Sequence, residues 1–489
     1  MDQAYSRQSE DFPSVVTALA GVMRADQVIG DPESCGVYSN DAYTTARQLP
    51  MCVVLPESTQ DVVAIVNTCR EFNTPLVTRG AGTGLSGGAT PLPNAVLMVT
   101  SRMQFMGTPQ GQRMWVGPGV RNQAISDAVA PMGLYFAPDP SSQIASTIGG
   151  NVAENSGGIH CCKYGVTVNN VCALEVVTAT GEVMMLGSEG LDSPGLDLLA
   201  LMHASEGLMA VVTGVCVELL PIPPTQKVIA AGYKDLFDAS EAVAQVFEAG
   251  LMPAALEVVD GNLIQAVEGL LNAGFPTQCG GMVLLEMDGT DGEVEETVQA
   301  AADILGRKAM TLETSRDEAH RLHLWKARKA AFPAMAMNSP DILVLDATVP
   351  RQALATALRE ISQLAESTGF RVWNAYHAGD GNIHPSVLFD AAQGQTEAAH
   401  QLGAEVLKVC LSHGGTITGE HGIGIEKIDY MCMQFSRQEN QCFQNLKSAW
   451  DAEELFNPGK AIPTPHHCAE GGALHVHQGQ FPHPELERF

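Results

Sequence analysis

The sequence predicts an α+β protein with more than one domain, and three observations carry this prediction. Residues 53–100 read as strand, amphipathic helix, strand, glycine-rich loop and strand. Residues 221–225 hold three prolines within four positions, a composition that neither a helix nor a strand can continue through. The length of 489 residues also exceeds that of a typical single domain. We therefore expect two or three domains, with one limit near residue 222.

The first part of the chain supplies most of the predicted regular elements. Residues 13–29 are amphipathic and predict a helix, and residues 53–56 predict a strand. Ser58 is a typical N-cap for the helix that follows, which we expect to end at residues 73–75. Valine-rich strands are expected at 171–179 and 183–186, joined by a tight turn at 180–182.

The loop at residues 80–91 has the composition of an anion-binding site. Five glycines, at 80, 82, 84, 87 and 88, let backbone N–H groups converge on a phosphate. The spacing of Gly82, Gly84 and Gly87 matches the Rossmann dinucleotide pattern, which requires a helix to begin inside the motif. Here residues 88–93 lead through prolines into another strand. The loop therefore favours a diphosphate cradle between two strands, and a mobile surface loop is the alternative.

A second segment, residues 136–165, is rich in small residues, amides and hydroxyls. Such a composition lets the backbone lie against a flat ring and hydrogen-bond to its heteroatoms. A turn-rich connection is the alternative. Two segments of this kind close together in the chain favour a flavin site.

These two segments carry the first family resemblance. Residues 79–88 resemble the FAD loop of vanillyl-alcohol oxidase type flavoproteins, and residues 136–165 resemble their second FAD segment. The resemblance implies a two-lobed FAD-binding domain at 12–222. We expect the FAD to be held without a covalent bond, because the loop consists largely of glycines and hydroxyl residues and the sequence offers no strong candidate for a histidine that tethers flavin. Residues 204–213 and 452–460 resemble two further motifs of these proteins, although the first departs at Ala204 and at residues 208–210. The implied FAD contacts are Arg79, Gly80, Ala81, Gly82, Thr83, Gly84, Leu85, Ser86, Gly87, Pro138, Asp139, Ser141, Gly149, Gly150, Asn151, Gly157, Glu206 and Asn457.

Residues 226–425 form the predicted second domain, with helices near 236–249 and 291–305 and strands near 281–287 and 342–349. Its stretch 316–329 concentrates five of the 27 basic residues of an acidic chain. On a helix, Arg321, Trp325 and Arg328 share one face. A guanidinium there can bind a carboxylate through two parallel hydrogen bonds. A solvated basic face is the alternative.

Residues 376–385 and 418–424 hold the densest group of metal-binding and acid–base residues. His377, His384 and Glu420 would form a three-ligand divalent metal site with an open position, as catalytic metals require. Two histidines and a carboxylate suit zinc, iron or manganese. An acid–base network without metal is the alternative. His421 is the expected general base, because imidazole titrates near neutral pH.

The last 260 residues resemble the substrate domain of FAD-linked 2-hydroxy-acid dehydrogenases. Residues 323–334 and the end of the chain are similar to bacterial glycolate oxidase D subunits. The resemblance implies a ferredoxin-like α+β substrate domain, a return segment at 426–465 that packs on the FAD lobe, and a tail at 466–489. It also implies that Arg328 binds the substrate carboxylate and that His377, His384, Glu420 and His421 act as described.

The implied activity is oxidation of a small 2-hydroxy acid, glycolate first, to the 2-oxo acid. D-lactate and D-2-hydroxyglutarate are alternative substrates. Relatives that bind a diacid carry a lysine two positions before the residue matching Asp346, where this chain has Val344. That valine favours a small monoacid. An alternative of another class is a non-catalytic flavin carrier or assembly subunit.

Charge and composition limit the possible partners. The formal net charge of −28 disfavours nucleic acid and anionic membrane surfaces. No Cys-x-x-Cys pair, Rossmann loop or membrane-spanning run is present, and the N-terminus does not resemble a signal peptide. The resemblance therefore implies a second flavoprotein-like subunit and an iron–sulfur subunit that pass electrons to a membrane quinone. We expect a cytoplasmic protein that meets the inner membrane only through those subunits.

Overall fold

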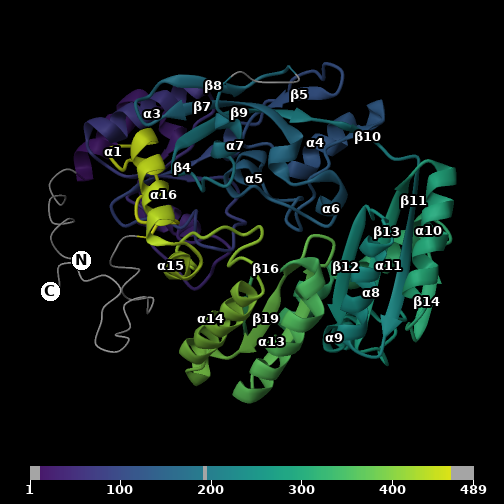
Figure 1. Cartoon of the computed structure of the whole chain (residues 1–489). Coiled ribbons are helices and arrows are strands. Elements are labelled where there is room, and N and C mark those ends of the chain that lie inside the picture. The colour runs from purple at the N-terminus through teal and green to yellow at the C-terminus, as the bar shows by residue number, and fades with distance from the viewer. Residues whose placement is uncertain (1–11, 191–194, 464–489) are drawn as a thin grey trace. The chain divides into compact units, whose positions relative to one another are not determined.

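The computed structural model describes residues 12–190 and 195–463, which form two compact units (Figure 1). Unit 1 comprises three segments: the residues up to Ser156, Val166–Pro221, and the residues from His421 onward. Unit 2 comprises Gly157–Gly165 and Ile222–Glu420. The segment 157–165 thus belongs to unit 2, although the sequence analysis placed it in the FAD domain. The N-terminal residues considered for a signal peptide and the predicted tail at 466–489 lie outside the described residues.

Unit 1 contains a four-stranded sheet in the order β1-β2-β4-β3. Its strands are β1 (Val28–Ile29), β2 (Cys52–Val54), β3 (Leu76–Arg79) and β4 (Val96–Val99). Strands β2 and β3 both run parallel to β4, and helix α3 (Thr59–Glu71) connects β2 to β3. The Ser58 hydroxyl accepts a hydrogen bond from the Asp61 N–H at 3.2 Å. The predicted strand, helix, strand, loop and strand are therefore confirmed, including the cap.

The helix predicted at 13–29 is wrong in its second half. Helix α1 (Phe12–Val22) ends early, and Val28 and Ile29 instead pair with β2 as an antiparallel strand. The β-branched residues Val28 and Ile29 gain a sheet partner there, which their amphipathic spacing could not reveal.

A second sheet of unit 1 has the order β5-β9-β7-β8 and is antiparallel. Its strands are β5 (Arg113–Val116), β7 (Val171–Thr178), β8 (Val183–Gly187) and β9 (Ala210–Glu218), and β6 (Leu134–Tyr135) pairs with β10 (Leu220–Pro221). Gly181 makes the predicted turn between β7 and β8 with φ +81°. Near the chain end, Leu76 N–H donates to the Leu455 carbonyl at 2.8 Å and Asn457 N–H donates to the Leu76 carbonyl at 2.9 Å. Residues 455–457 therefore lie alongside β3.

The remaining helices of unit 1 are short except at its C-terminal end. They are α2 (Pro32–Cys35), α4 (Asn122–Val129), α5 (Ile148–Glu154), α7 (Leu198–Met202), α15 (Met431–Gln434) and α16 (Arg437–Trp450). Across the described part of the chain, no helix has the length and apolar character needed to cross a membrane.

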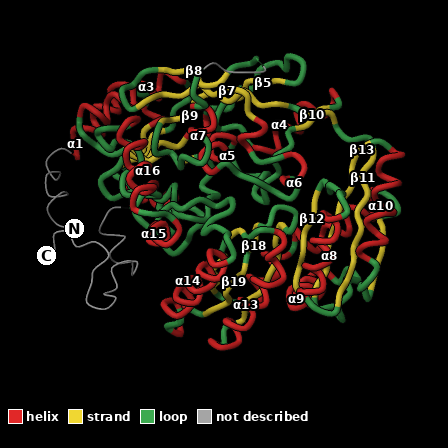
Figure 2. Tube along the Cα trace, viewed as in Figure 1, coloured by secondary structure: helices red, strands yellow, loops and turns green. Residues whose placement is uncertain are grey.

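Unit 2 begins its main sheet with a ferredoxin-like arrangement (Figure 2). The elements β11 (Thr225–Tyr233), α8 (Leu236–Glu248), β12 (Ala255–Asp260), β13 (Gly281–Gly289), α10 (Asp291–Leu305) and β14 (Thr311–Thr314) give the order βαββαβ, with one additional helix, α9 (Gly261–Leu271), between β12 and β13. The strand order β14-β11-β13-β12, with antiparallel neighbours, is that of the split βαβ fold. This confirms the predicted fold class.

The sheet of unit 2 then extends beyond β12. It continues through β17 (Arg371–His377), β18 (Asn382–Ile383) and β16 (Ala347–Thr348), and β19 (Pro385–Phe389) pairs with both β17 and β15 (Asp341–Val344). The other helices are α6 (Cys161–Tyr164), α11 (Glu318–Lys329), α12 (Ala331–Asn338), α13 (Leu354–Thr368) and α14 (Thr396–Ser412). The strand predicted at 342–349 is in fact interrupted at Leu345 and Asp346.

One face of this sheet packs on helices α9, α11 and α12. The buried cluster there combines Val228, Ala255, Val259, Met282, Leu284 and Ala375 of the sheet with Leu263, Leu324 and Trp325 of the helices. Side chains alternate between the two faces of a strand. Glu257, Glu286 and His377 therefore project from the same face as these apolar residues, toward α11.

Candidate active site

At three glycines of the loop in unit 1, Gly80, Gly82 and Gly87, an added Cβ would lie within 3 Å of another residue. A Cβ at Gly80 would lie 2.2 Å from the Thr147 hydroxyl oxygen, and one at Gly82 would lie 2.1 Å from an Arg79 guanidinium nitrogen. Gly82 also has φ +75°, which only glycine adopts at little cost. The sequence therefore uses glycine here because backbone, hydroxyl and guanidinium groups approach one another closely.

Side chains from distant segments fix this loop. The Asp41 carboxylate accepts from Ala89 N–H at 3.1 Å, and the Gly88 carbonyl accepts from Asn457 Nδ2 at 3.0 Å and from Lys460 Nζ at 2.8 Å. Arg79 Nη1 donates to the Asn40 carbonyl at 2.6 Å. Burial lowers the pKa of Lys460 to about 7. The loop is therefore a fixed element.

Buried hydroxyls near the loop supply a test of whether FAD fits. The hydroxyl oxygens of Thr78, Ser146 and Thr147 are buried and have no hydrogen-bond partner among the described residues. Unsatisfied buried hydroxyls next to a glycine-rich loop suit a ligand rich in phosphate and hydroxyl oxygens. The residues present therefore fit FAD.

The predicted FAD contacts fall in both units. Those at 79–87, 138–151, Glu206 and Asn457 belong to unit 1, whereas Gly157 belongs to unit 2. The Glu206 carboxylate is already occupied, because it accepts from the N–H groups of Ile423 and Gly424 at 2.7 Å each. Glu206 thereby fixes the segment that follows His421.

His421 lies in unit 1, on a segment that is hydrogen-bonded to the glycine loop. The Ser86 hydroxyl donates to the His421 carbonyl at 3.0 Å, and the Ser86 carbonyl accepts from the N–H groups of Ile425 and Glu426. The expected base and the expected FAD loop therefore share one hydrogen-bonded scaffold.

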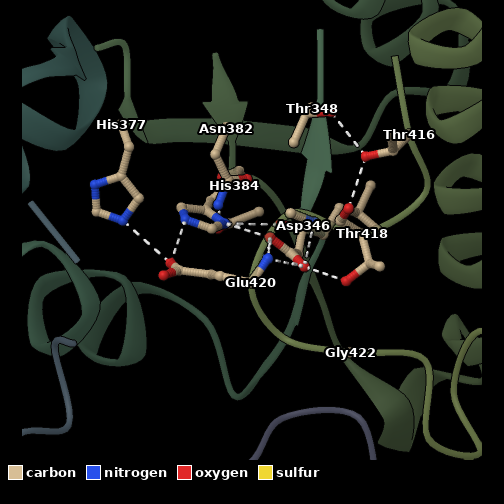
Figure 3. Close-up of polar contacts among 12 residues, drawn as sticks. Asp346, Thr348, His377, Asn382, His384, Thr416, Thr418, Glu420 and Gly422 are labelled. Atoms are coloured by element: carbon tan, nitrogen blue, oxygen red, sulfur yellow. Dashed lines mark hydrogen bonds and ion pairs between the residues drawn. The ribbon is translucent and has the colours of Figure 1, made fainter. Parts of the chain in front are cut away.

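The structure brings His377, His384 and Glu420 together in unit 2. Their nitrogen and oxygen atoms all lie within 4.8 Å of one another. His377 Nε2 is 3.1 Å and His384 Nε2 is 3.4 Å from the same Glu420 oxygen, and both rings point toward that carboxylate (Figure 3). Two imidazole nitrogens and one carboxylate oxygen converging in this way fit a divalent transition metal.

Asp346 explains the break between β15 and β16. This fully buried carboxylate accepts from the Thr418 hydroxyl at 2.6 Å, from Gly419 N–H at 2.9 Å and from Glu420 N–H at 3.2 Å (Figure 3). Leaving the strand ladder at Asp346 lets its side chain hold the backbone that carries Glu420.

Sequence reasoning missed Glu257, a fully buried residue of β12 that lies directly across from His377 in the sheet. One carboxylate oxygen lies 2.6 Å from His377 Nδ1, and the other accepts from Arg328 Nε at 2.7 Å. The available signal was an acid in the middle of the otherwise apolar run Ala255–Val259, whereas Asp260 at the end of the strand caps helix α9. A carboxylate in such a strand needs buried cationic or N–H partners, which here are Arg328 and His377.

The neighbouring carboxylates determine the protonation of His377. Burial opposes its charged form, but the negative charges of Glu257 and Glu420 outweigh burial and raise the pKa of His377 well above its ordinary value. The His377 charge in turn holds the pKa of Glu420 well below its ordinary value, against the effect of burial. A bound metal would replace the proton at His377 Nε2, since a ligating imidazole must be neutral.

Helix α11 presents Arg321, Trp325 and Arg328 to the sheet. Arg321 Nη1 and Trp325 Nε1 each donate to Glu286 at 2.7 Å, and Arg328 donates to Glu257. Each arginine side chain is only 13% exposed. This part of the basic stretch is therefore not a solvated face, because two buried carboxylates hold it.

Comparisons with known proteins agree with this architecture. Residues 50–187 match the family described as FAD binding domain, and residues 222–461 match FAD linked oxidases, C-terminal domain. The fold resembles 4-ethylphenol oxidase from Gulosibacter chungangensis at a TM-score of 0.78, with 17% identity, over 94% of this chain and 98% of that one. It resembles p-cresol methylhydroxylase with substrate bound at a TM-score of 0.78, with 15% identity, over 93% and 97%. The fold is thus that of the vanillyl-alcohol oxidase type flavoproteins, as predicted.

Other relatives have a higher sequence identity to this chain than these two structures have. The chain is 47% identical to glycolate oxidase subunit GlcD of Escherichia coli (strain K12), over 98% of this chain and 97% of that protein. GlcD of Bacillus subtilis (strain 168) is 35% identical over 87% and 91%, and a D-lactate dehydrogenase of Archaeoglobus fulgidus is 31% identical over 84% and 91%.

The fold and the matched domains define an FAD-linked oxidoreductase. Within that class, the chain belongs to the family of the glycolate oxidase subunit GlcD.

Proposed function

We propose that this chain oxidises glycolate to the corresponding 2-oxo acid with non-covalently bound FAD, as the catalytic subunit of a larger complex. The observation that carries the proposal is the arrangement in unit 2. Arg328 and the group of His377, His384 and Glu420 are linked by Glu257, in a chain 47% identical to a glycolate oxidase subunit. A carboxylate-binding cation beside a set of metal-binding donors matches the two functional groups of a 2-hydroxy acid.

Different residues act on the carboxylate and on the hydroxyl group of the substrate. Arg328 binds the substrate carboxylate through a charge-assisted pair, and this fixes the orientation of C2. His421 accepts the proton of the 2-hydroxyl group as general base. FAD, when bound, supplies the acceptor for the hydride of C2.

His377, His384 and Glu420 would hold a divalent ion, with zinc, iron and manganese as the candidates. Such an ion would act as a Lewis acid that lowers the cost of deprotonating an adjacent hydroxyl. The hydrogen bonds from 418–420 to Asp346 and from His377 to Glu257 hold these donors in place. This support restricts the donors to one geometry.

D-lactate is the second candidate substrate, because a D-lactate dehydrogenase is 31% identical over 84% of the chain. D-2-hydroxyglutarate is less favoured. Val344, two positions before Asp346, is apolar and would leave a second carboxylate without a cation at that position. The buried, hydrogen-bonded donors of unit 2 argue against a flavin carrier without catalytic function.

A substrate screen tests the proposal. Under anaerobic conditions, glycolate should bleach the flavin absorbance of the purified chain faster than D-lactate, and D-2-hydroxyglutarate should be slowest. Faster bleaching by D-lactate would assign the chain to the second candidate. If none of the three acids bleaches a fully FAD-loaded preparation, the catalytic proposal fails.

A further inference from the structure

Two buried glutamates on neighbouring strands make parallel ion pairs with helix α11. Glu286 of β13 pairs with Arg321, and Glu257 of β12 pairs with Arg328, each at 2.7 Å. Both carboxylates are fully buried, and both project from the sheet face that packs on α11. The two pairs are therefore matched in position and burial, and their differences show what each one does.

The pair of Glu286 and Arg321 is satisfied by protein groups. Glu286 also accepts from Trp325 Nε1 at 2.7 Å and lies 3.2 Å from His160 Nε2. The remaining donors of Arg321, Nε and Nη2, both bind Glu318, at 2.7 and 2.8 Å. This network fixes α11 on the sheet and gives each of the three Arg321 guanidinium nitrogens a carboxylate partner.

The pair of Glu257 and Arg328 is open on the arginine side. Arg328 uses only Nε, and among the described residues its two Nη groups have no hydrogen-bond partner. The Arg328 side chain is only 13% exposed, and an anion could complete its free Nη groups through charge-assisted hydrogen bonds. The Nη groups, held by the Nε bond, form the planar fork that binds a carboxylate through two hydrogen bonds.

Glu257 also sets the tautomer of His377. If a metal displaced the proton of His377 Nε2, the remaining proton on Nδ1 would donate to Glu257, whose oxygen lies 2.6 Å away, and the lone pair would lie on Nε2, which faces Glu420. Carboxylates that accept from a metal-ligating histidine orient the ring and raise its basicity. The same carboxylate therefore serves the histidine through one oxygen and the arginine through the other.

We propose that Glu257 is a positioning residue that orients Arg328 for the substrate carboxylate and His377 for a divalent metal ion, and thereby couples the two binding events. This inference rests on the proposed function for the identity of the substrate. The proposed effect of Glu257 on metal binding rests only on the geometry of unit 2.

The test compares Glu257→Gln with Glu286→Gln in the full-length, FAD-loaded chain. Arg328 and His377 bind different oxygens of Glu257, so a glutamine in the same position would present its NH₂ group to one of these two donors. Glu257→Gln should weaken Zn²⁺ binding, measured by competition with a chelator, by 10- to 100-fold. It should also raise KM for glycolate at least tenfold. Glu286→Gln should change both quantities less than threefold, even if it lowers the unfolding midpoint equally.

Equal effects of the two glutamine variants on Zn²⁺ affinity and KM would overturn the proposal, because they would reflect a general loss of packing. A second pair of variants, Arg328→Lys and Arg321→Lys, tests the proposal if Glu257→Gln does not fold. Arg328→Lys should alter Zn²⁺ affinity at least threefold although Arg328 is not a metal donor, whereas Arg321→Lys should not. No difference between these two lysine variants would also reject the coupling.

The Zn²⁺ measurements need no substrate. Failure of the wild-type chain to oxidise glycolate would therefore reject the proposed function. The Zn²⁺ affinities would still decide whether Glu257 positions His377 for a metal ion.

Discussion

Lys460 shows how strongly burial acts on a single ion in this protein. The residue is 2% exposed, and its ammonium group donates to the carbonyls of Gly88 and Thr90. Burial is the main cause of its lowered pKa, about 7 against an ordinary value of 10.5, although Asp41, Glu206 and Glu154 favour its charge. Between these two pKa values the unfolded chain binds more protons than the folded chain, so stability should increase with pH.

We therefore expect the free energy of unfolding of the wild type to increase by about 2 kcal/mol between pH 7 and 9, relative to Lys460→Met. The variant also loses hydrogen bonds at every pH, so the diagnostic quantity is the difference in slope. Urea unfolding at several pH values measures it. Exposed Lys308, which pairs with Asp238 and Glu241, provides the control, and Lys308→Met should keep the wild-type slope. Parallel curves for wild type and Lys460→Met would contradict the expectation.

Arg328 differs from Arg321 in having free Nη groups, and this difference predicts distinct kinetic effects. Arg328→Lys keeps the charge and loses the planar fork. Losing one charge-assisted interaction should cost about 1.5–3 kcal/mol in kcat/KM for 2-hydroxy acids, measured with an artificial dye as acceptor. Arg321→Lys removes contacts to Glu318 and Glu286 instead, and should affect stability more than kcat/KM. Unchanged kcat/KM in Arg328→Lys would mean that the arginine does not contact the substrate.

At the scale of elements, the glycine loop combines a strained backbone with close packing. Gly82 has φ +75° and no room for a Cβ, whereas Gly111 has φ +63° and open space around it. Comparing the two positions separates the cost of the backbone conformation from the cost of displacing Arg79.

Gly82→Ala should lower the FAD content of the purified chain by more than half, because the new methyl group displaces the Arg79 guanidinium beneath the loop. Gly111→Ala should retain wild-type FAD and lose about 1 kcal/mol of stability. The ratio of flavin absorbance to protein absorbance reports the occupancy. Full FAD occupancy in Gly82→Ala would show that the loop does not bind the diphosphate.

The end of β17, the residue between β18 and β19, and the segment 418–420 together carry the proposed metal donors His377, His384 and Glu420. His377→Ala and Glu420→Ala should both reduce bound metal and activity at least tenfold while FAD content stays close to wild type, since the FAD loop belongs to unit 1. Elemental analysis and flavin absorbance measure the two quantities. Active wild-type protein without a stoichiometric metal would instead identify the cluster as an acid–base network.

At the scale of the whole molecule, the chain has a predicted site for loading electrons onto FAD but no cysteine spacing typical of an iron–sulfur cluster. We propose that partner subunits, one flavoprotein-like and one with iron–sulfur clusters, carry electrons to a quinone. The isolated chain should reduce an artificial dye with glycolate but reduce quinone only when partners are co-expressed. Rapid quinone reduction or peroxide formation by the chain alone would show that it needs no partner.

Local patterns in the sequence were sufficient to predict those elements whose structure depends on neighbouring residues. Ser58 capped α3 as predicted, and the glycines and prolines at 80–93 correctly indicated a loop between two strands in place of a Rossmann helix. Capping, turn formation and backbone freedom are properties of a few consecutive residues, and so they can be read directly from the chain. The helix predicted through residue 29 was wrong because Val28 and Ile29 gain a sheet partner 25 positions or so away, at residues 53 and 54.

Identifying which residues of the site contact one another required the tertiary structure. Glu257 meets Arg328 across 71 positions and His377 across 120 positions, and Asp346 reaches the backbone of Gly419 across 73. A single buried acid in a strand indicates that a partner must exist, but sequence alone does not say which one. Strand order and register decide that partner, because they place Glu257 opposite His377 and beneath α11. The sequence by itself therefore determined the fold class and supplied the expected FAD loop and candidate donors, whereas the pairing of β12 with β17 decided which buried carboxylate holds His377.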